Sequence, residues 1–382
     1  MDFKLDKQHL MLQQLFRTFA DEQIKPLARE MDENEKYDEE LLQKLQKFGF
    51  FGIPFSRAYG GAGSDALAYA LCMEEVSRVD ASTGITLSVH TSLCCSCINS
   101  FGTEAQKQTF LRPLIDGSMI GCYGLTEPGA GSDVQGAQTT AVRDGDGWVI
   151  NGSKMFTTNS GFADICVLFA LTDRSVPAAR GMTAFIVDLK NTPGITVSSS
   201  IERMGIRAAN NCIVTYDNVR IPGDRVLGQV NRGFKIAMSA LDCGRVGIAA
   251  QAVGIAQGAL NEAIKYGKER KQFGKSIVAF QNSQFQIAEI QTKIDAARLL
   301  TWRAAVAEDS HEPFGTYAAM AKLYASDVAV QATRLAVQLM GGYGYCREYP
   351  VERMYRDAKI TEIYEGTSEV MKMVIAGSMK LK

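Results

Sequence analysis

The chain has 382 residues, 46% of them hydrophobic, and a formal net charge of −1 at neutral pH. A chain of this length can bury a large core, and the length favours two or three domains. Because no basic excess is present to hold a phosphate backbone, we expect no nucleic-acid partner. The charged N-terminus lacks an apolar signal core, and no run of eighteen apolar residues follows it. We therefore expect a soluble, cytoplasmic protein of bacterial type with no membrane partner.

Nine cysteines occur in the chain, and Cys94, Cys95 and Cys97 lie close together. A structural zinc or iron–sulfur site needs paired Cys-x-x-Cys elements or a partnering histidine, and the three histidines are scattered. We therefore predict buried, reduced thiols and no metal site.

The spacing of apolar residues changes twice along the chain. Helical spacing dominates residues 7–112, whereas short β-branched and aromatic runs separated by turn signals predict strands, and a small barrel, over about 121–230. Long helices are then predicted at 234–270, 281–308, 316–340 and 351–378, which favours a bundle. The expected fold is α+β and multidomain, with an N-terminal helical domain (1–120), a central β-barrel (121–232) and a C-terminal four-helix bundle (233–382).

The common nucleotide-binding loops are missing from the sequence. Gly274-Lys275-Ser276 has the end of a phosphate loop, but Glu269 stands where the leading glycine is required. The segment 129–134 lacks the third glycine and the following helix of a dinucleotide fold. Redox chemistry would then need a tightly held cofactor and an external electron partner.

Near the C-terminus, Glu365 stands between Tyr364 and Gly366. A carboxylate beside aromatic and aliphatic neighbours loses hydration, which raises its pKa, and Gly366 lets the backbone approach a ligand. The segment predicts a catalytic base. The competing interpretation is a surface glutamate at a helix end.

Three further segments carry chemical signals. Residues 122–133 read CYGLTEPGAGSD and combine amides, hydroxyls and glycines, although alone they are compatible with an ordinary turn. Residues 151–159 read NGSKMFTTN, and residues 269–275 read ERKQFGK, with an arginine placed to grip a pyrophosphate. Together with residues 356–369 around Glu365, these segments resemble the acyl-CoA dehydrogenases, flavoenzymes that desaturate acyl-CoA thioesters between the α and β carbons. The order of helical and strand-rich parts also resembles this family over essentially the whole chain.

The resemblance implies an FAD site in the first two segments. The residues implied along the flavin ring and pyrophosphate are Tyr123, Leu125, Thr126, Gly131, Ser132, Phe156 and Thr158. Phe156 stands where many relatives carry tryptophan, a change that keeps the stacking face and loses an N–H donor. The competing interpretation makes Phe156 a core residue of a strand.

The resemblance also implies that a neighbouring subunit completes each FAD site. The residues assigned to the neighbour's flavin and its adenosine diphosphate part are Arg270, Gln272, Phe273, Gln338, Gly341 and Gly342, and Thr367 and Glu369 complete the cofactor set. A site of this kind is complete only on assembly, which predicts an obligate oligomer, by analogy a homotetramer. The competing interpretation of residues 269–275 is a solvated charge run.

For the acyl-CoA, the resemblance places Asp242 and Arg245 against the pantetheine and nucleotide portions, and a local salt bridge is the alternative. Ser132, Tyr364 and Gly366 complete the implied substrate set.

Two glycines bear on the substrate. Gly244 stands where isovaleryl- and long-chain-type relatives carry their base, and Gly84 stands where glutaryl-CoA enzymes carry an arginine. The resemblance therefore implies an uncharged, unbranched acyl chain. The candidates for the pocket floor are Ser88, Thr91, Cys94 and Cys95.

The implied reaction pairs removal of the α-proton by Glu365 with hydride transfer to the flavin, while the Glu365 backbone N–H and a ribityl hydroxyl bind the thioester oxygen. The expected function is dehydrogenation of a short-chain acyl-CoA such as butyryl-CoA, with electron-transferring flavoprotein as acceptor. The alternatives are an enoyl-CoA (crotonyl-, acrylyl- or aryl-acrylyl-CoA) reductase that uses the same partner, an oxygen-using flavin oxidase or monooxygenase, and a non-catalytic acyl-CoA-binding subunit.

Overall fold

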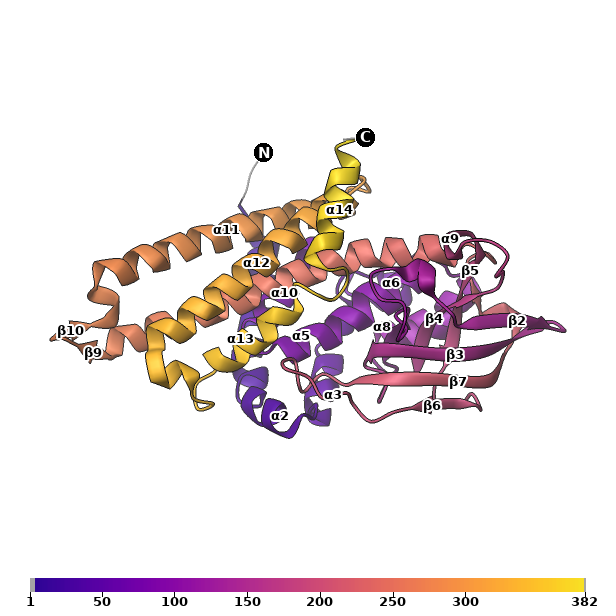
Figure 1. Cartoon of the computed structure of the whole chain (residues 1–382), viewed down its shortest axis with the longest axis horizontal. Coiled ribbons are helices and arrows are strands. Elements are labelled where there is room, and N and C mark those ends of the chain that lie inside the picture. Colours follow the sequence, from indigo (N-terminus) through magenta and orange to yellow (C-terminus); the bar gives the residue numbers. More distant parts are fainter. Residues whose placement is uncertain (1–3, 381–382) are drawn as a thin grey trace.

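The computed structural model describes residues 4–380 of the chain. Residues 1–3 and 381–382, at the ends of the first and third predicted domains, lie outside the described residues. Figure 1 shows the strand-rich part at one end of an elongated molecule and the long C-terminal helices running to the other end. The first strand begins at Gly121 and the first long C-terminal helix at Gly233. The division into three domains at these points stays a prediction.

The N-terminal part is helical, as predicted. Its helices are α1 (Lys7–Phe19), α2 (Ala28–Asn34), α3 (Glu39–Lys47), α4 (Ala66–Ser77), α5 (Ala81–Ser88), α6 (Ser96–Phe101), α7 (Glu104–Gln106) and α8 (Arg112–Ile115). Aspartates begin α4 and α5, because the Asp65 carboxylate accepts a hydrogen bond from the Ala68 amide and that of Asp80 accepts one from Thr83. Both helices are buried along almost their whole length.

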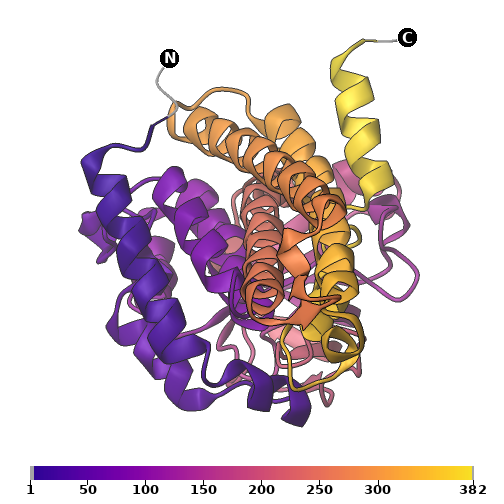
Figure 2. The ribbon, with the colours of Figure 1, turned by 90° about the vertical axis from the view of Figure 1, so that its left-hand side faces the viewer.

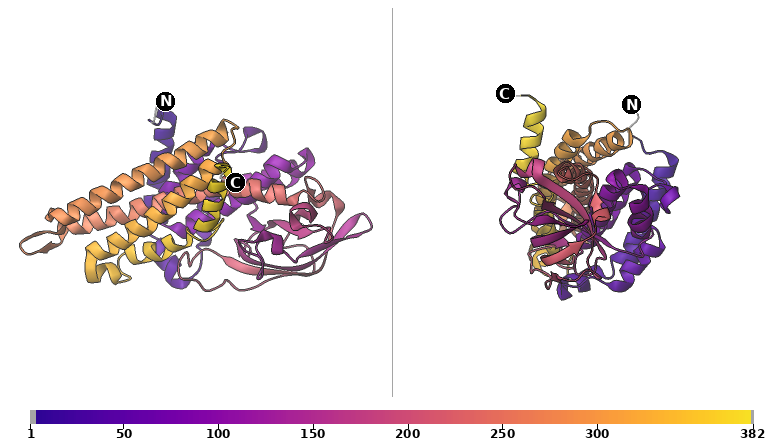
Figure 3. Two further views of the ribbon diagram at one scale, coloured as in Figure 1. Left: turned by 45° about the horizontal axis from the view of Figure 1, so that its top comes forward. Right: turned by 90° about the vertical axis from the view of Figure 1, so that its right-hand side faces the viewer.

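The middle part is one eight-stranded sheet. Its strands are β1 (Gly121–Gly124), β2 (Thr140–Asp144), β3 (Gly147–Thr158), β4 (Ile165–Leu171), β5 (Met182–Asp188), β6 (Ile195–Val197), β7 (Asn211–Ile221) and β8 (Val226–Leu227), with a short α9 (Ala178–Gly181). They pair in the order β6-β7-β3-β2-β4-β5-β8, and β1 pairs with β4. Among the described residues, the two outermost strands, β6 and β8, do not pair with each other. The predicted barrel is therefore not closed by backbone hydrogen bonds at this point. Figure 3, right, shows the sheet in front of the C-terminal helices and beside the N-terminal ones.

The C-terminal part contains α10 (Gly233–Glu269), α11 (Gln281–Asp309), α12 (Gly315–Met340), α13 (Val351–Ile360) and α14 (Ser368–Ser378). A small hairpin of β9 (Lys271–Gln272) and β10 (Lys275–Ser276) joins α10 to α11. Glycines let α10 pack closely on α4, because a Cβ at Gly254 would lie 2.2 Å from the Glu74 carbonyl oxygen. Through this contact the bundle and the N-terminal helices share one core.

The predicted single helix over 351–378 is wrong. Helix α13 ends at Ile360 and α14 begins at Ser368. Between them Glu365 and Gly366 have φ angles of +52° and +102°, which no right-handed helix can contain. Figure 2 shows α14 (yellow) standing away from the bundle as a result. Because of this break, Glu365 lies in a loop between two helices and not within one helix.

None of the described helices is long and apolar enough to cross a membrane. Within residues 4–380 no three His, Cys, Asp or Glu side chains are grouped so as to hold a metal ion. Cys94, Cys95 and Cys97 are buried free thiols.

Candidate active site

Glu365 lies on the turn between α13 and α14, with its side chain directed at α10. Both carboxylate oxygens are buried, and neither has a hydrogen-bond partner among the described residues. A Cβ added at Gly244 of α10 would lie 1.8 Å from Glu365 Oε2 and 3.0 Å from a methyl carbon of Leu93. The carboxylate therefore occupies the place that a side chain at position 244 would fill.

Burial sets the acidity of this carboxyl group. It raises the pKa of Glu365 to about 8, although the charges of Lys322 and Arg245 act in the opposite direction. A carboxylate without hydrogen bonds and with a pKa near neutrality can accept a proton from carbon at physiological pH.

Two cations hold the turn that carries Glu365. Arg245, 6% exposed, donates from Nε to the Glu365 carbonyl oxygen at 3.4 Å and from Nη1 to Asp242 Oδ1 at 2.6 Å. Lys322 donates from Nζ to the Gly366 carbonyl oxygen at 2.7 Å. The local salt bridge between Asp242 and Arg245, considered as an alternative, is present, and it places both side chains beside the turn. Tyr364 is also anchored here, because its hydroxyl donates to Gln251 Oε1.

The segment after β1 offers both packed and open positions. The Tyr123 ring packs on Phe169 with centroids 5.0 Å apart, and its hydroxyl donates to the Ala237 carbonyl oxygen at 3.3 Å. Leu125 is buried and Thr126 half-buried. Gly131 and Ser132 are exposed, and a Cβ at Gly131 would touch nothing within 4 Å. The glycine-rich end of the segment is thus free for a ligand.

Phe156 lies in β3 and is not a core residue. Its side chain is 52% exposed and its φ is +55°, at an irregularity in the pairing of β3 with β7. An exposed aromatic residue in a left-handed backbone conformation is uncommon and occurs preferentially at ligand sites. The neighbouring Thr158 is buried and accepts a hydrogen bond at Oγ1 from Asn211 Nδ2 at 2.9 Å.

The sequence reasoning missed a buried ion pair that joins these two segments. Lys154, with no exposed surface, donates to Glu127 Oε1 at 2.7 Å and to the Leu125 carbonyl oxygen at 3.0 Å. Glu127 also accepts from the amides of Gln138 at 2.6 Å and Thr139 at 3.0 Å. Burial opposes ionisation of Glu127, but Lys154 and these amides lower its pKa below the usual value. The alternation of buried residues along β3 was a usable signal, because it points position 154 inward.

The remaining predicted cofactor residues lie at two other places. Thr367 and Glu369 stand at the start of α14, where Thr367 Oγ1 accepts from the Val370 amide. Arg270, Gln272, Gly341 and Gly342 line a cavity of about 550 Å³ beside the hairpin, Gln338 is exposed nearby, and Phe273 is 94% exposed. The hairpin and β3 lie at opposite ends of the molecule (Figure 1). One chain therefore does not bring all its predicted cofactor residues to one ligand.

Two of the proposed pocket-floor residues point elsewhere. A Cβ at Gly121 would lie 2.5 Å from Cys94 Sγ, so this thiol packs on β1, and the Cys95 thiol contacts His90 Nε2 at 3.3 Å. Ser88 does face α10, since a Cβ at Gly247 would lie 2.9 Å from its Oγ. Thr91 is buried and its hydroxyl has no partner in the described part of the chain.

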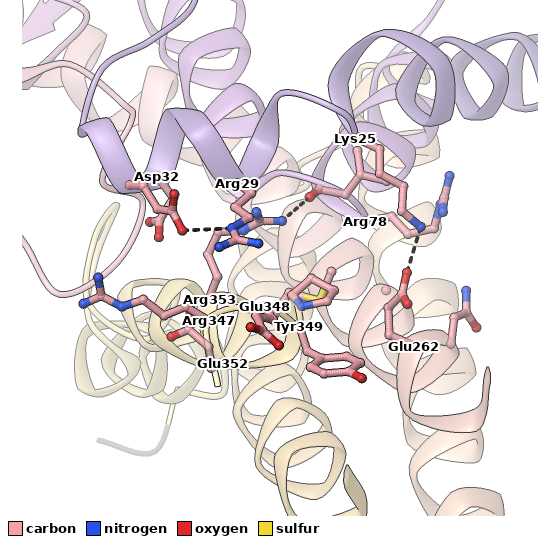
Figure 4. Close-up of a pocket in the computed structure, with 16 residues that line it drawn as sticks. Lys25, Arg29, Asp32, Arg78, Glu262, Arg347, Glu348, Tyr349, Glu352 and Arg353 are labelled. Atoms are coloured by element: carbon pink, nitrogen blue, oxygen red, sulfur yellow. Dashed lines mark hydrogen bonds and ion pairs between the residues drawn. The ribbon is translucent and has the colours of Figure 1, made fainter. Parts of the chain in front are cut away.

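A second cavity, of about 200 Å³, lies between the N-terminal helices and α10 and α13 (Figure 4). Its lining contains five basic and five acidic side chains. Two ion pairs, Lys25 with Glu262 at 2.7 Å and Arg29 with Glu33 at 2.9 Å, lie at its wall. It includes none of the predicted site residues, and its balanced charge fits a polar seam between packed elements.

Comparison with known proteins places these features in a family. Models of the N-terminal, middle and C-terminal domains of acyl-CoA dehydrogenase match residues 6–118, 122–219 and 231–380. The chain belongs to the acyl-CoA dehydrogenase family.

Relatives of known name match over their full length. The chain is 50% identical to the short-chain specific acyl-CoA dehydrogenase of Clostridium acetobutylicum, over 99% of this chain and 100% of the relative. It is 44% identical to a subunit of the caffeyl-CoA reductase–Etf complex of Acetobacterium woodii, over 98% and 99%. The solved structure of butyryl-CoA dehydrogenase from Megasphaera elsdenii superposes with a TM-score of 0.97 at 46% identity, covering 100% of both chains.

FAD is the cofactor of this family, and the residues present fit it. The exposed Phe156 offers an aromatic face, and the open Gly131 leaves room for a backbone approach to phosphate. Arg270 and Gly341 offer a cation and an unhindered backbone at the other end of the chain.

Proposed function

We propose that this protein dehydrogenates a short-chain acyl-CoA thioester to the trans-2-enoyl-CoA, with Glu365 as the catalytic base and electron-transferring flavoprotein as the electron acceptor. The observation that carries the proposal is the buried Glu365 carboxylate, which has no hydrogen-bond partner in residues 4–380 and a raised pKa. A structural carboxylate would be paired in such a place. This one is left available for a proton of the substrate.

In the proposed reaction Glu365 takes the proton from the α-carbon. FAD, when bound, supplies the acceptor for the hydride of the β-carbon. The backbone N–H of Glu365 donates no hydrogen bond within the described residues, and we assign it to the thioester oxygen, where negative charge develops. Arg245 and Lys322 add positive charge around the same turn.

The packing along α10 supports the proposal that the acyl chain is short. One turn beyond Gly244, a Cβ at Gly247 would lie 2.8 Å from the Tyr69 hydroxyl. Gln251 is fully buried and closes the next turn through hydrogen bonds to Ala81 and Tyr364. With a rise of 1.5 Å per residue, the seven residues from Gly244 to Gln251 cover only about 10 Å.

The other assigned residues keep their predicted roles in this proposal. Those for the flavin and its phosphates are Tyr123, Leu125, Thr126, Gly131, Ser132, Phe156, Thr158, Thr367 and Glu369, those for the neighbour's FAD are Arg270, Gln272, Phe273, Gln338, Gly341 and Gly342, and those for acyl-CoA are Ser132, Asp242, Arg245, Tyr364 and Gly366. The separation of the two cofactor groups within one chain supports an assembly in which each subunit completes its neighbour's site, by analogy a homotetramer. The cytoplasmic location stays a prediction.

A second candidate function is the reverse reaction. The Acetobacterium woodii relative is a subunit of a caffeyl-CoA reductase–Etf complex. The same base and flavin could therefore serve physiologically to reduce an enoyl-CoA with electrons from electron-transferring flavoprotein.

An anaerobic titration of the purified flavoprotein with butyryl-CoA tests the proposal. We expect the flavin absorbance to bleach in the wild type and to persist in Glu365→Gln. The control is Glu362→Gln, which should bleach like the wild type; it removes another carboxylate of the same turn, one that pairs with Lys359 of α13. Bleaching by Glu365→Gln at the wild-type rate would refute the base assignment. Rapid reoxidation of the bleached enzyme by air would identify an oxidase. Turnover rates measured in both directions, with oxidised and with reduced electron-transferring flavoprotein, compare a dehydrogenase with a reductase.

A further inference from the structure

Helix α12 holds the catalytic turn at both ends. Ser326 Oγ donates to the Thr361 carbonyl oxygen at 2.8 Å, and Lys322 Nζ donates to the Gly366 carbonyl oxygen at 2.7 Å. The two side chains are four residues apart and so lie on one face of the helix. Between the two carbonyl groups, Glu365 has a φ of +52°, a conformation that a non-glycine residue keeps only when its surroundings enforce it.

The two contacts differ in their cost. Ser326 is neutral, whereas Lys322 brings an ammonium group into a position with no exposed surface. Its one hydrogen bond goes to a neutral carbonyl, and no carboxylate of the described residues forms an ion pair with it. Burying a cation in this way is costly, and a neutral donor would satisfy the carbonyl equally well. The charge itself therefore needs an explanation.

The charged and titratable groups around the turn supply one. Those that act on Glu365 or Lys322 are Arg245 on α10, Glu362 and Glu369 at the ends of the turn, and the hydroxyls of Tyr69, Tyr123 and Tyr364. Arg245 already shares its charge with Asp242. Lys322 has no such ion pair within residues 4–380, so its field acts on the unpaired carboxylate of Glu365.

We propose that Lys322 is a positioning residue for the catalytic base: it fixes the Glu365 turn through the Gly366 carbonyl, and its unpaired charge favours ionisation of the Glu365 carboxyl group in a buried site. The inference rests on the proposed function of Glu365. Burial lowers the pKa of Lys322 to about 8 and raises that of Glu365 to about 8, and each group opposes this by favouring the charged form of the other.

The test is the pH dependence of flavin bleaching by butyryl-CoA in four variants of the holoenzyme. Lys322→Gln keeps a donor and removes the charge, Lys322→Met removes both, Lys322→Arg keeps the charge, and Ser326→Ala removes the neutral contact. Without the charge the base ionises less readily, so we expect the acid limb of the rate profile to move up by about one pH unit in the Gln and Met variants. At a pH below the limb, the Gln and Met variants should bleach about tenfold more slowly than the wild type, and at higher pH their rate should recover.

We expect Lys322→Arg and Ser326→Ala to keep the wild-type limb, because both retain a cation at position 322. A wild-type limb in Lys322→Gln would overturn the proposal, even if the rate fell at every pH, since that is what a purely structural contact predicts. If Lys322→Met does not fold, the Gln and Arg variants decide the question. Glu365→Gln, run in parallel, separates the two levels: bleaching in that variant refutes the base itself, whereas an inactive Glu365→Gln with an unmoved Lys322→Gln limb refutes only the role of Lys322.

Discussion

Replacing Lys154 by methionine tests how the two flavin segments are held together. The substitution keeps the length and most of the apolar stem but removes the ammonium group. Glu127 is then left as a carboxylate that is 6% exposed and has only two amide donors, and the Leu125 carbonyl loses the donor at 3.0 Å. Removing one partner of a buried ion pair typically costs about 3–5 kcal/mol. Added burial of the thioether recovers about 1 kcal/mol, so we expect a net loss of about 3 kcal/mol.

A second substitution separates the destabilisation caused by the uncompensated Glu127 charge from that caused by altered packing at position 154. Glu127→Gln in the Lys154→Met background removes the uncompensated charge and leaves one amide oxygen, which can accept from the Gln138 or the Thr139 amide. We therefore expect the double variant to be more stable than Lys154→Met by about 1–3 kcal/mol. We expect Lys154→Met to melt about 4 °C below the wild type, with partial recovery in the double variant, when thermal unfolding is monitored by the release of flavin.

The same melts would refute the reasoning in two ways. A Lys154→Met protein within 1 °C of the wild type would mean that the pair contributes nothing to the fold. A double variant no better than Lys154→Met would mean that lost packing, and not the uncompensated charge of Glu127, causes the loss.

Four further outcomes are expected. Gly244→Ala places a methyl group where Glu365 Oε2 lies, 1.8 Å from the Cβ position, so bleaching by butyryl-CoA should slow about 100-fold with little change in melting temperature; an unchanged rate would show that the carboxylate acts from elsewhere. The bleaching rate of the wild type should rise with pH through about 8, because only ionised Glu365 accepts the proton, and a flat profile between pH 6 and 9 would contradict this. Phe273→Ala should weaken FAD retention and assembly, visible as flavin loss and slower sedimentation on dilution, while unchanged sedimentation would place Phe273 outside the interface. Burial raises the pKa of Asp357 to about 7 from an unfolded value of 3.8, so this group costs stability progressively as pH rises between those values; Asp357→Asn should reduce the fall in melting temperature over that range, and an equal fall in both proteins would exclude Asp357 as its source.

Local patterns predicted much of the fold. The change from helical spacing to short β-branched runs near residue 121, and back near 233, is a local property, and the structure changes from helix to strand and back at Gly121 and Gly233. The break in the last predicted helix was not accessible in this way. A left-handed glutamate has no propensity signal of its own, and the carbonyl of the next residue, Gly366, accepts a hydrogen bond from Lys322, 44 residues earlier in the chain.

In the candidate site, too, local sequence patterns predict some features, whereas others depend on contacts between distant parts of the chain. The burial of Glu365 was inferred from its neighbours Ile363 and Tyr364, but Ile363 is 48% exposed. The carboxylate is desolvated by its contact with α10 at Gly244, which adjacent residues do not report. The inward direction of Lys154 was present in the period-two pattern of β3 but has meaning only once Glu127 is known to lie opposite. Phe156 could be misread as core because positions 148, 150 and 154 of the same strand are buried, and the sequence does not show the pairing irregularity between Lys154 and Thr157 at which Phe156 becomes exposed.

The hairpin between α10 and α11 has a thermodynamic consequence for the proposed assembly. Phe273 presents 94% of its surface to solvent, with a φ of +52°, at the end of the molecule remote from β3. A lone chain that exposes this ring gains nothing from it, whereas a neighbour whose FAD covers the ring recovers the burial. Cofactor and subunit then act as mutual ligands. By mass action, diluting the protein should release FAD, and adding FAD should oppose dissociation, so that neither affinity is a fixed property of the single chain.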